Sequence, residues 1–428
     1  MVSAAEQLAA NLNFSALAKA EELKKRIWFT LGALIVYRLG TYIPLPGIDP
    51  SVWSQVFRQQ AGGILGMFNM FSGGGIDRMA IFALNIMPYI SASIILQLLT
   101  SVSPKLEALK KEGEAGRKVI NQYTRYLTVV LAALQAYGIA IGLQGAGNVV
   151  SQPGLFFLIS TTITLTGGTM FLMWLGEQIT ARGIGNGISL IIMAGIVAEL
   201  PSAIVGTLEL GRQGALSTGL ILAVLVMAVA VIGIIVFVER AQRRLLIQYP
   251  KRQVGNKMFE GQSSHLPLKL NTSGVIPPIF ASSLLLLPGT VANFNAGAGP
   301  EWFQWITTQL SHGRPAYLIL YVGMILFFTF FYTAIVFNPT ETADNLKKHG
   351  GFIPGIRPGE RTAEYIDYVL SRITVVGAIY LALICLIPEI LISYASVPFY
   401  FGGTSLLIVV SVTMDTVAQV QGYLLAHQ

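Results

Sequence analysis

The sequence "NIMPYISASIILQLLT" occupies residues 85–100 and places a proline within an otherwise apolar stretch. Residues 274–283, "GVIPPIFASS", repeat its pattern of apolar residue, Pro, any residue, Ile, any residue, Ala and Ser. Proline in a membrane helix frees a backbone carbonyl that lipid cannot satisfy, so such segments face protein or water. A kink between packed helices explains each proline alone. The matched pair instead indicates an internal repeat with the functional site at its interface.

The composition identifies an integral membrane protein. Of the 428 residues, 53% are hydrophobic and only 11% are charged, whereas soluble domains carry about 25% charged residues. Ten apolar stretches are long enough to cross a bilayer. They lie at about 27–43, 79–100, 126–143, 155–176, 184–206, 217–238, 273–292, 316–337, 373–393 and 402–424.

Basic residues alternate between the loops and indicate the orientation. They are concentrated before the first span and in the loops after spans two, six and eight, and they are sparse in the other loops. The positive-inside rule therefore places the N-terminus and the two long basic loops, 239–272 and 338–372, in the cytoplasm. Residues 1–26 are amphipathic and predict a helix lying on the membrane surface.

The ten spans divide into two halves of five, residues 27–206 and 207–428. Because five is odd, the halves face opposite ways in the membrane, which makes the proline segments equivalent parts of an inverted repeat. Hydrogen-bonding side chains lie near both segments: Gln97, Asn271, Thr272 and Ser273. Such contacts hold helices together by about 0.6–2 kcal/mol each. They are weak enough to open, although ordinary helix packing explains each residue equally well.

Charged residues within the spans bear on whether the chain is a transporter. An ion-coupled secondary transporter needs ionisable groups at the membrane midplane. Four candidates fall towards span ends, where snorkelling or a local partner explains them: Arg38, Glu177, Glu199 and Glu389. Asp415 lies deeper, and we expect it to form a structural hydrogen bond. The proline repeat carries isoleucines instead, which would form a water-poor constriction if they face a central cavity.

The sequence contains no arrangement of nucleophilic, metal-ligating or phosphate-binding residues that indicates a catalytic, metal or nucleotide site. The glycines of residues 182–187, "RGIGNG", predict a tight turn that opens span five. The single cysteine, Cys385, lies in an apolar run and is expected in the core. We therefore expect neither enzyme activity nor a cofactor.

Residues 62–78, "GGILGMFNMFSGGGIDR", form an apolar stub on the outer side between spans one and two. The stub is far shorter than the ~20 residues that a spanning helix needs, and glycines flank it on both sides. It predicts a short re-entrant helix whose central residues are Ile64, Leu65, Met67, Phe68, Asn69, Met70 and Phe71.

Several stretches closely resemble the SecY family of protein-translocation channel subunits. They include "YRLGTYIPLPGID" (37–49), "KKEGEAGRKVINQYTRY" (110–126), "MFLMWLGEQITARGIGNGISLII" (170–192) and "FNPTETADNLKKHGGFIPGIRPGERTAEYID" (337–367). The likeness covers nearly the whole chain. It implies an all-α membrane protein of the bacterial cytoplasmic membrane, with ten helices in two inverted halves around an hourglass pore.

The resemblance also implies the parts of a gated channel. The stub would be a plug beneath a ring of isoleucines that seals the pore, namely Ile86, Ile90, Ile192, Ile279 and Ile408. The halves would open towards lipid between spans two and seven, a lateral gate for signal sequences and membrane helices. The gate residues are Pro88, Ser91, Gln97, Asn271, Thr272, Pro277 and Pro278.

The partners implied by the resemblance are other subunits, a motor and the ribosome. SecE and SecG would brace the channel in the lipid bilayer, and SecDF and YidC are further expected partners. Signal peptides and nascent chains would be the cargo. The SecA ATPase or ribosomal RNA would dock on basic residues of the two long loops: Arg243, Arg244, Lys251, Arg252, Lys257 and Arg357.

Two residues depart from the family pattern. Asn85 stands where we expect glycine, and Asn256 stands where a basic residue is common. An ion-coupled transporter with an inverted repeat is the main alternative, and a membrane scaffold without a pore is a third.

Overall fold

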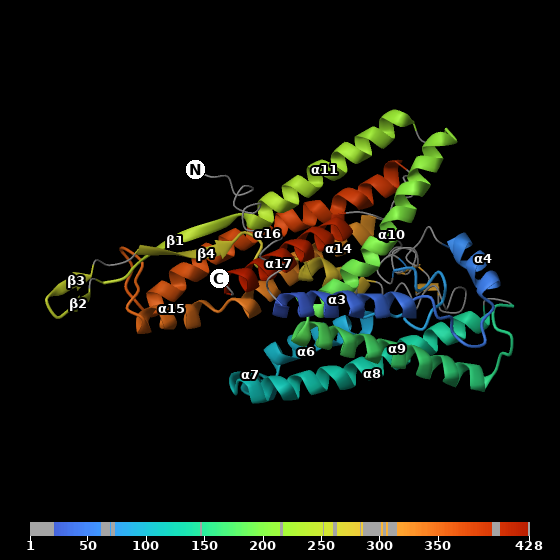
Figure 1. Ribbon diagram of the computed structural model, residues 1–428, viewed down its shortest axis with the longest axis horizontal. Coiled ribbons are helices and arrows are strands. Elements are labelled where there is room, and N and C mark those ends of the chain that lie inside the picture. The colour runs from blue at the N-terminus through green and yellow to red at the C-terminus, as the bar shows by residue number, and fades with distance from the viewer. Residues whose placement is uncertain are drawn as a thin grey trace.

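Long helices form most of the computed structural model, and a narrow β-arm extends from one end of them (Figure 1). The structure describes residues 21–60, 69, 73–145, 148–214, 217–250, 252–259, 263–282, 284–285, 301–302, 305–306, 315–395 and 403–426. The helices are α3 (Glu21–Gly40), α4 (Pro50–Gln60), α6 (Met87–Val102), α7 (Pro104–Lys111), α8 (Glu114–Gly145), α9 (Leu155–Arg182), α10 (Gly187–Arg212), α11 (Thr218–Arg240), α14 (Pro315–Val336), α15 (Pro339–Lys348), α16 (Glu360–Ala395) and α17 (Gly403–Ala426).

Helix is found at each of the ten predicted spans. Within the described residues, seven helices are long and apolar enough to cross a membrane: α8, α9, α10, α11, α14, α16 and α17. Helix α3 covers the first predicted span, the shorter α6 lies in the second, and residues 276–282 are helical within the seventh. Residues 24–26 lie in α3, which continues into the first predicted span, and residues 1–20 of the predicted surface helix lie outside the described residues.

The start of span two differs from the prediction, which placed a helix from residue 79. The helix begins only at Met87, and residues 73–79 and 81–86 form turns. Met79 and Asn85 have positive φ angles of 43° and 52°, which a right-handed helix does not allow. Asparagine tolerates this left-handed conformation better than other residues with a Cβ. The backbone therefore explains why position 85 suits either glycine or asparagine.

Backbone amides and carbonyls of this non-helical stretch form hydrogen bonds with other parts of the protein, as a membrane environment requires. The amide of Ile81 donates to the Ile43 carbonyl (3.0 Å), and the Met79 carbonyl accepts from Leu45 (3.1 Å). The Trp53 indole of α4 donates to the Ile76 carbonyl at 2.6 Å. Helix α4 is thereby fixed against the end of the bundle opposite the β-arm (Figure 1).

The residue that precedes α4 is an acceptor for the first turn of that helix. Asp49 Oδ1 accepts from the Ser51 hydroxyl at 2.7 Å and from the Ser51 amide at 3.1 Å. These hydrogen bonds hold the pKa of the Asp49 carboxyl below its usual value.

The two long basic loops fold together at the other end, which we call the basic end. Strand β1 (Gln242–Gln248) pairs antiparallel with β4 (Ser263–Lys269), and β2 (Arg252–Val254) pairs with β3 (Lys257–Phe259) to form the tip. Gln248 also exchanges two backbone hydrogen bonds with Phe352, of 2.9 and 3.0 Å. The loop after span six is therefore joined to the loop after span eight.

The turn between β2 and β3 explains the second departure from the family pattern. Gly255, with φ of 66°, and Asn256 form the two-residue connection between the strands. Gly-Asn pairs suit such tight hairpin turns, so asparagine at position 256 has a structural reason.

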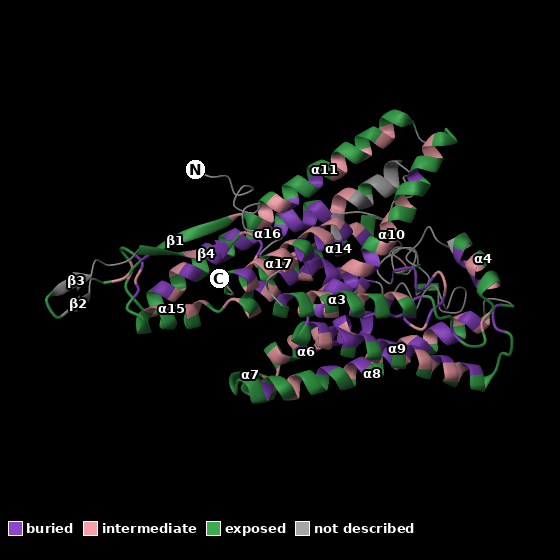
Figure 2. Ribbon diagram, in the orientation of Figure 1, coloured by how far each residue is buried: buried purple, intermediate pink, exposed green. Residues whose placement is uncertain are grey.

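Buried residues are concentrated in the middle of the bundle, where α3, α10, α14 and α17 overlap in the view (Figure 2). Helix α11 is mostly exposed along its length, as is the outer face of α8. Cys385 is 1% exposed and belongs to the central apolar cluster, which confirms its predicted place in the core.

Two glycines bring α9 and α10 into direct backbone contact after the predicted turn at residues 183–186. A Cβ on Gly187 would collide with the carbonyl oxygen of Gly176. The Gly187 amide donates to Thr180 Oγ1 at 2.9 Å, and Asn186 Oδ1 accepts from the Ile188 amide at 3.1 Å to cap α10. The turn is therefore fixed by contacts that leave no room for a side chain.

This contact predicts a contrast between two glycines of the same helix. Gly187→Ala should destabilise the protein by about 1–3 kcal/mol, because the new methyl group overpacks the junction. Gly206→Ala should be neutral or slightly stabilising, since nothing lies within 4 Å of a Cβ there and alanine favours helix. Thermal unfolding in detergent measures both variants. Equal melting temperatures for the two variants would contradict the packing argument.

Candidate functional site

Five isoleucines from both halves of the chain converge in one buried apolar cluster. Ile86 lies just before α6 and Ile90 within it, Ile192 is in α10, Ile279 is in helical residues 276–282, and Ile408 is in α17. Their exposed fractions are 1%, 5%, 3%, 8% and 1% in the same order. The structure therefore brings together all five residues of the predicted ring.

The surroundings of these isoleucines are also apolar. Ile94, Ile191, Ile196, Leu407 and Val412 belong to the same cluster and are each 5% exposed or less. Burying a large aliphatic side chain contributes about 1.5–3 kcal/mol. A cluster of this kind resists water, because an apolar cavity stays dry. Its chemistry suits a seal between the halves and offers no site for a polar solute.

Both proline segments line this cluster closely. Pro88 and Ser91 of α6 are buried, and Pro277 and Pro278 are buried in the second segment. Ile90 and Ile94 share the cluster with Ile279, Phe280 and Ala281. The two predicted gate segments therefore contribute aliphatic and aromatic side chains to the same buried cluster.

The polar residues near the prolines bond within their own halves. Asn271 Nδ2 donates to Glu239 Oε1 of α11 at 2.7 Å and to the Gly274 carbonyl at 3.2 Å. Thr272 Oγ1 donates to the Lys269 carbonyl at 3.1 Å. The Oε1 atom of Gln97 is buried and has no hydrogen-bond partner in the described part of the chain. Asn271 thus joins the second proline segment to α11 rather than to Gln97.

Two arginines converge on Gly73, which follows the central apolar residues of the predicted stub. Arg38 Nη1 donates to the Gly73 carbonyl at 2.7 Å, and Arg78 Nη2 donates to the same oxygen at 3.2 Å. Arg78 Nε also donates to the Thr41 carbonyl at 3.1 Å. The Arg78 guanidinium lies 4.0 Å from the centre of the Tyr42 ring. We call these contacts the Gly73 clasp.

The clasp fixes one end of the stub to the rest of the protein. Gly73 has φ of 68°, and a Cβ there would lie 3.0 Å from the Gly195 Cα of α10. Asn69 accepts from the Gly74 amide through its carbonyl (3.0 Å) and from the Asp77 amide through its side chain (2.9 Å). Asn69 is the one residue of the predicted plug that is described. The others, Ile64, Leu65, Met67, Phe68, Met70 and Phe71, lie outside the described residues.

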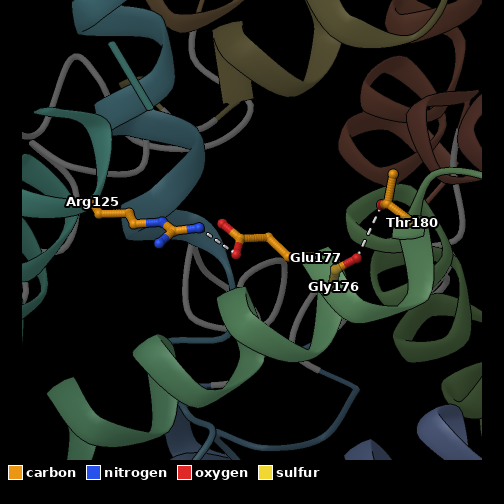
Figure 3. Close-up of polar contacts among 4 residues, drawn as sticks. All are labelled: Arg125, Gly176, Glu177 and Thr180. Atoms are coloured by element: carbon orange, nitrogen blue, oxygen red, sulfur yellow. Dashed lines mark hydrogen bonds and ion pairs between the residues drawn. The ribbon is translucent and has the colours of Figure 1, made fainter. Parts of the chain in front are cut away.

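An ion pair connects α8 and α9 near the basic end. Arg125 Nη2 lies 2.6 Å from Glu177 Oε2, beside the hydrogen bond from Thr180 Oγ1 to the Gly176 carbonyl (Figure 3). The side chains are 48% and 34% exposed, so the pair contributes about 1 kcal/mol or less. Of the two alternatives expected for Glu177, snorkelling and a local partner, the structure shows a local partner.

The deeper charge, Asp415, does not behave as predicted. Its side chain is exposed, and it forms no hydrogen bond within the described residues. The expected structural hydrogen bond is thus not found there. Glu389 belongs to α16, but its side chain is outside the described set.

The predicted docking residues lie at the basic end. Arg243 and Arg244 are exposed on β1, opposite Leu268 and Pro267 of β4. Arg357 is exposed in the loop between α15 and α16, where its carbonyl accepts from Thr362 Oγ1 at 2.8 Å. Arg252 and Lys257 are in β2 and β3, although their side chains are outside the described set, and Lys251 lies outside it altogether.

Sequence reasoning missed the Gly73 clasp and the connection between the basic loops. For Arg38 we expected snorkelling or a local partner, without naming that partner. The Gly73-Gly74-Gly75 run next to Arg78 was the available signal, because consecutive glycines expose carbonyls that an arginine can bind. No pattern in the sequence indicated the Gln248–Phe352 bridge.

Comparisons with known proteins agree with this architecture. A family model described as SecY matches residues 80–417. The protein translocase subunit SecY of Vibrio cholerae serotype O1 is 59% identical over 420 residues, which cover 97% of this chain and 94% of that protein.

Solved structures of low sequence identity share the fold. One is described as "The structure of a protein conducting channel", with a TM-score of 0.67, 17% identity, and coverage of 93% of this chain and 92% of the other. Another is a SecY protein whose plug domain is described as stabilising the closed state of the translocation channel, with a TM-score of 0.60, 18% identity and the same coverages.

The Gly73 clasp predicts local protection of the backbone around it. Replacing both Arg38 and Arg78 with Ala should raise amide hydrogen exchange of residues 74–80 about tenfold or more, because each lost hydrogen bond to a charged donor is worth about 1.5–3 kcal/mol. Arg58→Ala, on exposed α4, is the matched control and should leave that exchange unchanged. Unaltered exchange in the double variant would show that the clasp does not stabilise this segment.

Proposed function

The chain belongs to the SecY family, and we propose that it is the central channel subunit of a SecYEG-type translocon in the bacterial cytoplasmic membrane. Members of this family are protein-conducting channels without enzymatic activity.

The observation that carries the proposal is the convergence of Ile86, Ile90, Ile192, Ile279 and Ile408. Residues far apart in the sequence, from both halves, meet in one buried apolar cluster. We assign this cluster as the pore ring of the closed channel. Aliphatic side chains can fit loosely around an extended polypeptide, and without a polypeptide they exclude water and so block ions.

We assign the lateral gate to the contact between α6 and residues 276–285. Two features support it: the matched proline segments and the apolar character of the contact that they share. A signal sequence is itself an apolar helix. It can replace these contacts one for one, and it opens the gate by binding the open state more tightly than the closed one.

Residues 62–78 are proposed as the plug that lies on the outer side of the ring. Support comes from the apolar stub in the sequence and from the Gly73 clasp at its end. Glycines with positive φ at 73 and 74 let the chain turn where a side chain would be strained.

The basic end is proposed to face the cytoplasm and to bind the partners that supply energy. Exposed Arg243, Arg244 and Arg357 suit the phosphates of ribosomal RNA or acidic residues of SecA. SecE and SecG are proposed as bracing subunits in the bilayer, with SecDF and YidC as further partners. Transport then needs no chemistry from this chain, because translation or the ATPase drives the polypeptide.

The alternatives from the sequence lose support. An ion-coupled transporter required an ionisable midplane site, and the residue best placed for it, Asp415, is exposed on α17, where Lys269 is close enough to interact with its charge. The third alternative, a membrane scaffold without a pore, is inconsistent with the membership of this chain in a channel family.

Reconstitution tests the proposal directly. We expect the chain, placed in vesicles with SecE and SecG, to translocate a signal-bearing precursor when SecA and ATP are supplied. Protection of the precursor from added protease measures transport. A precursor without its signal is the matched control and should stay outside. Absence of transport with all partners present would overturn the assignment as a SecA-driven channel.

A single ring substitution tests the seal. Ile90→Asn should raise the ion conductance of the resting channel several-fold, because a polar side chain lets water wet the apolar constriction. Ile90→Val keeps an aliphatic side chain at the same place and should leave the conductance near that of the parent. Planar-bilayer recordings measure both. Equal, low conductance in the two variants would remove Ile90 from the seal.

A further inference from the structure

The Gly73 clasp contains two cations that share one neutral acceptor. Arg38 Nη1 and Arg78 Nη2 both donate to the Gly73 carbonyl, at 2.7 and 3.2 Å. Both guanidinium groups also lie near the Tyr42 ring, 5.4 and 4.0 Å from its centre. Like charges at such short range repel each other, and they do so more strongly where water is partly excluded. A nearby negative charge therefore stabilises the clasp.

Glu199 of α10 supplies a negative charge at this place. Its carboxylate is close enough to interact with the charges of Arg78 and Arg38. A Cβ on Gly74 would lie 2.5 Å from Glu199 Oε1 and 3.0 Å from both Nη1 and Nη2 of Arg78. The missing side chain at Gly74 thus lets the carboxylate approach the guanidinium. For Glu199 we expected snorkelling or a local partner, and the clasp arginines are its local partners.

The charged groups around the clasp balance one another. Asp77 is also close enough to interact with Glu199, so two cations and two anions lie together. Arg38, Asp77, Arg78 and Glu199 are all partly buried, and salt screens partly buried charges less than exposed ones. The buried Tyr37 hydroxyl interacts with both arginines and with Glu199. Removal of the Glu199 charge would leave the cluster with a net positive charge and no room to spread it into water.

Glu199 lies on the face of α10 that also carries Ile192. Positions 192, 195 and 199 are spaced by three and four residues, so they share one side of the helix. A Cβ on Gly73 would lie 3.0 Å from the Gly195 Cα, which places the clasp against this face. Ile192 lies seven residues before Glu199, or about 10 Å along the helix. One face of α10 therefore carries a residue of the proposed ring and, about two turns further on, the acidic partner of the clasp.

We propose that Glu199 is a positioning residue of the closed channel: its carboxylate neutralises the two clasp arginines and so holds the chain at Gly73, the end of the proposed plug, against α10. This inference rests on the plug assigned under the proposed function. With the carboxylate present, both arginines keep their hydrogen bonds to the Gly73 carbonyl. Without it, they repel each other and turn towards water, and the chain at Gly73 is released from Gly195.

The same substitution in two backgrounds tests this role. Glu199→Gln removes the charge and keeps the size of the side chain. In the complex with SecE and SecG, we expect it to raise amide hydrogen exchange of residues 74–80 about three- to fivefold, the scale of a partly exposed charge interaction. In a background with Arg38→Gln and Arg78→Gln, it should not raise this exchange further, because no cations remain to be neutralised. An equal increase in both backgrounds would overturn the proposal, since Glu199 would then act only through the packing of α10.

Two variants of the same helix are the controls. Glu199→Asp keeps the charge and should leave the exchange of residues 74–80 within about twofold of the parent. Glu209→Gln removes a carboxylate from an exposed position of α10 and should have no effect there. Exchange in α9 reports on the fold as a whole and should be the same in every variant. If Glu199→Gln raised exchange in α9 as much as in residues 74–80, the local role of Glu199 would be wrong.

Ion conductance of the resting channel separates this role from the proposed function. With the plug assigned correctly, Glu199→Gln raises the conductance in planar bilayers, and Glu199→Asp does not. Faster exchange at residues 74–80 with unchanged conductance would support the electrostatic role and overturn the plug assigned to residues 62–78. Raised conductance without faster exchange would overturn the role of Glu199 in the clasp. If the parent moves no precursor, the proposed function fails, while the exchange measurements still decide what Glu199 does.

Discussion

The structure depends on one constraint: within a membrane, each backbone amide and carbonyl that leaves a helix must find a partner in the protein. The chain leaves its helices at residues 73–86 and 271–275, directly before the two proline segments. At the first place, Ile43, Leu45, Trp53 and two arginines supply the partners. At the second place, Asn271 Nδ2 donates to the Gly274 carbonyl, and Thr272 Oγ1 donates to the Lys269 carbonyl just before it. Irregular backbone near the middle of the bundle is thus possible only because neighbouring segments are fixed against it.

This constraint separates two kinds of contact between the halves. Where the backbone is irregular, polar contacts stay within one half, as in Arg38 to Gly73 and Asn271 to Glu239. Isoleucines from both halves share one buried apolar cluster. A polar contact crosses between the halves at α17, where Gln419 Oε1 accepts from the Gly185 amide. This difference suits the proposed lateral gate, because apolar contacts are easily exchanged and directional ones are not.

The sequence was sufficient for the spans, because apolar length is a local pattern. The proline repeat led to Ile90 and Ile279, which belong to the same buried cluster, whereas Ile192 and Ile408 were named only through the family resemblance. The late start of α6 was not predictable, since residues 79–86 are as apolar as a helix, and their contacts with Ile43, Leu45 and Gly168 come from distant parts of the chain. The Gly73 clasp and the Gln248–Phe352 bridge depend on residues brought together by the fold, which no local pattern encodes.

The β-arm begins and ends at places that matter for the proposed gate. Only Ala241 separates the end of α11 from β1, and β4 ends at Lys269, two residues before Asn271. The Asn271–Glu239 hydrogen bond closes this base. Leu245 and Leu268 of the arm also pack with Ile353, Ile366 and Ile373 beside α16. A partner bound to Arg243 or Arg357 would therefore act on a single folded unit, which the chain joins to α11 through Ala241 and to the proposed gate segment through residues 270–275. Docking at the basic end and opening between α6 and that segment are thus connected through a few residues, without a signal having to pass across the bundle.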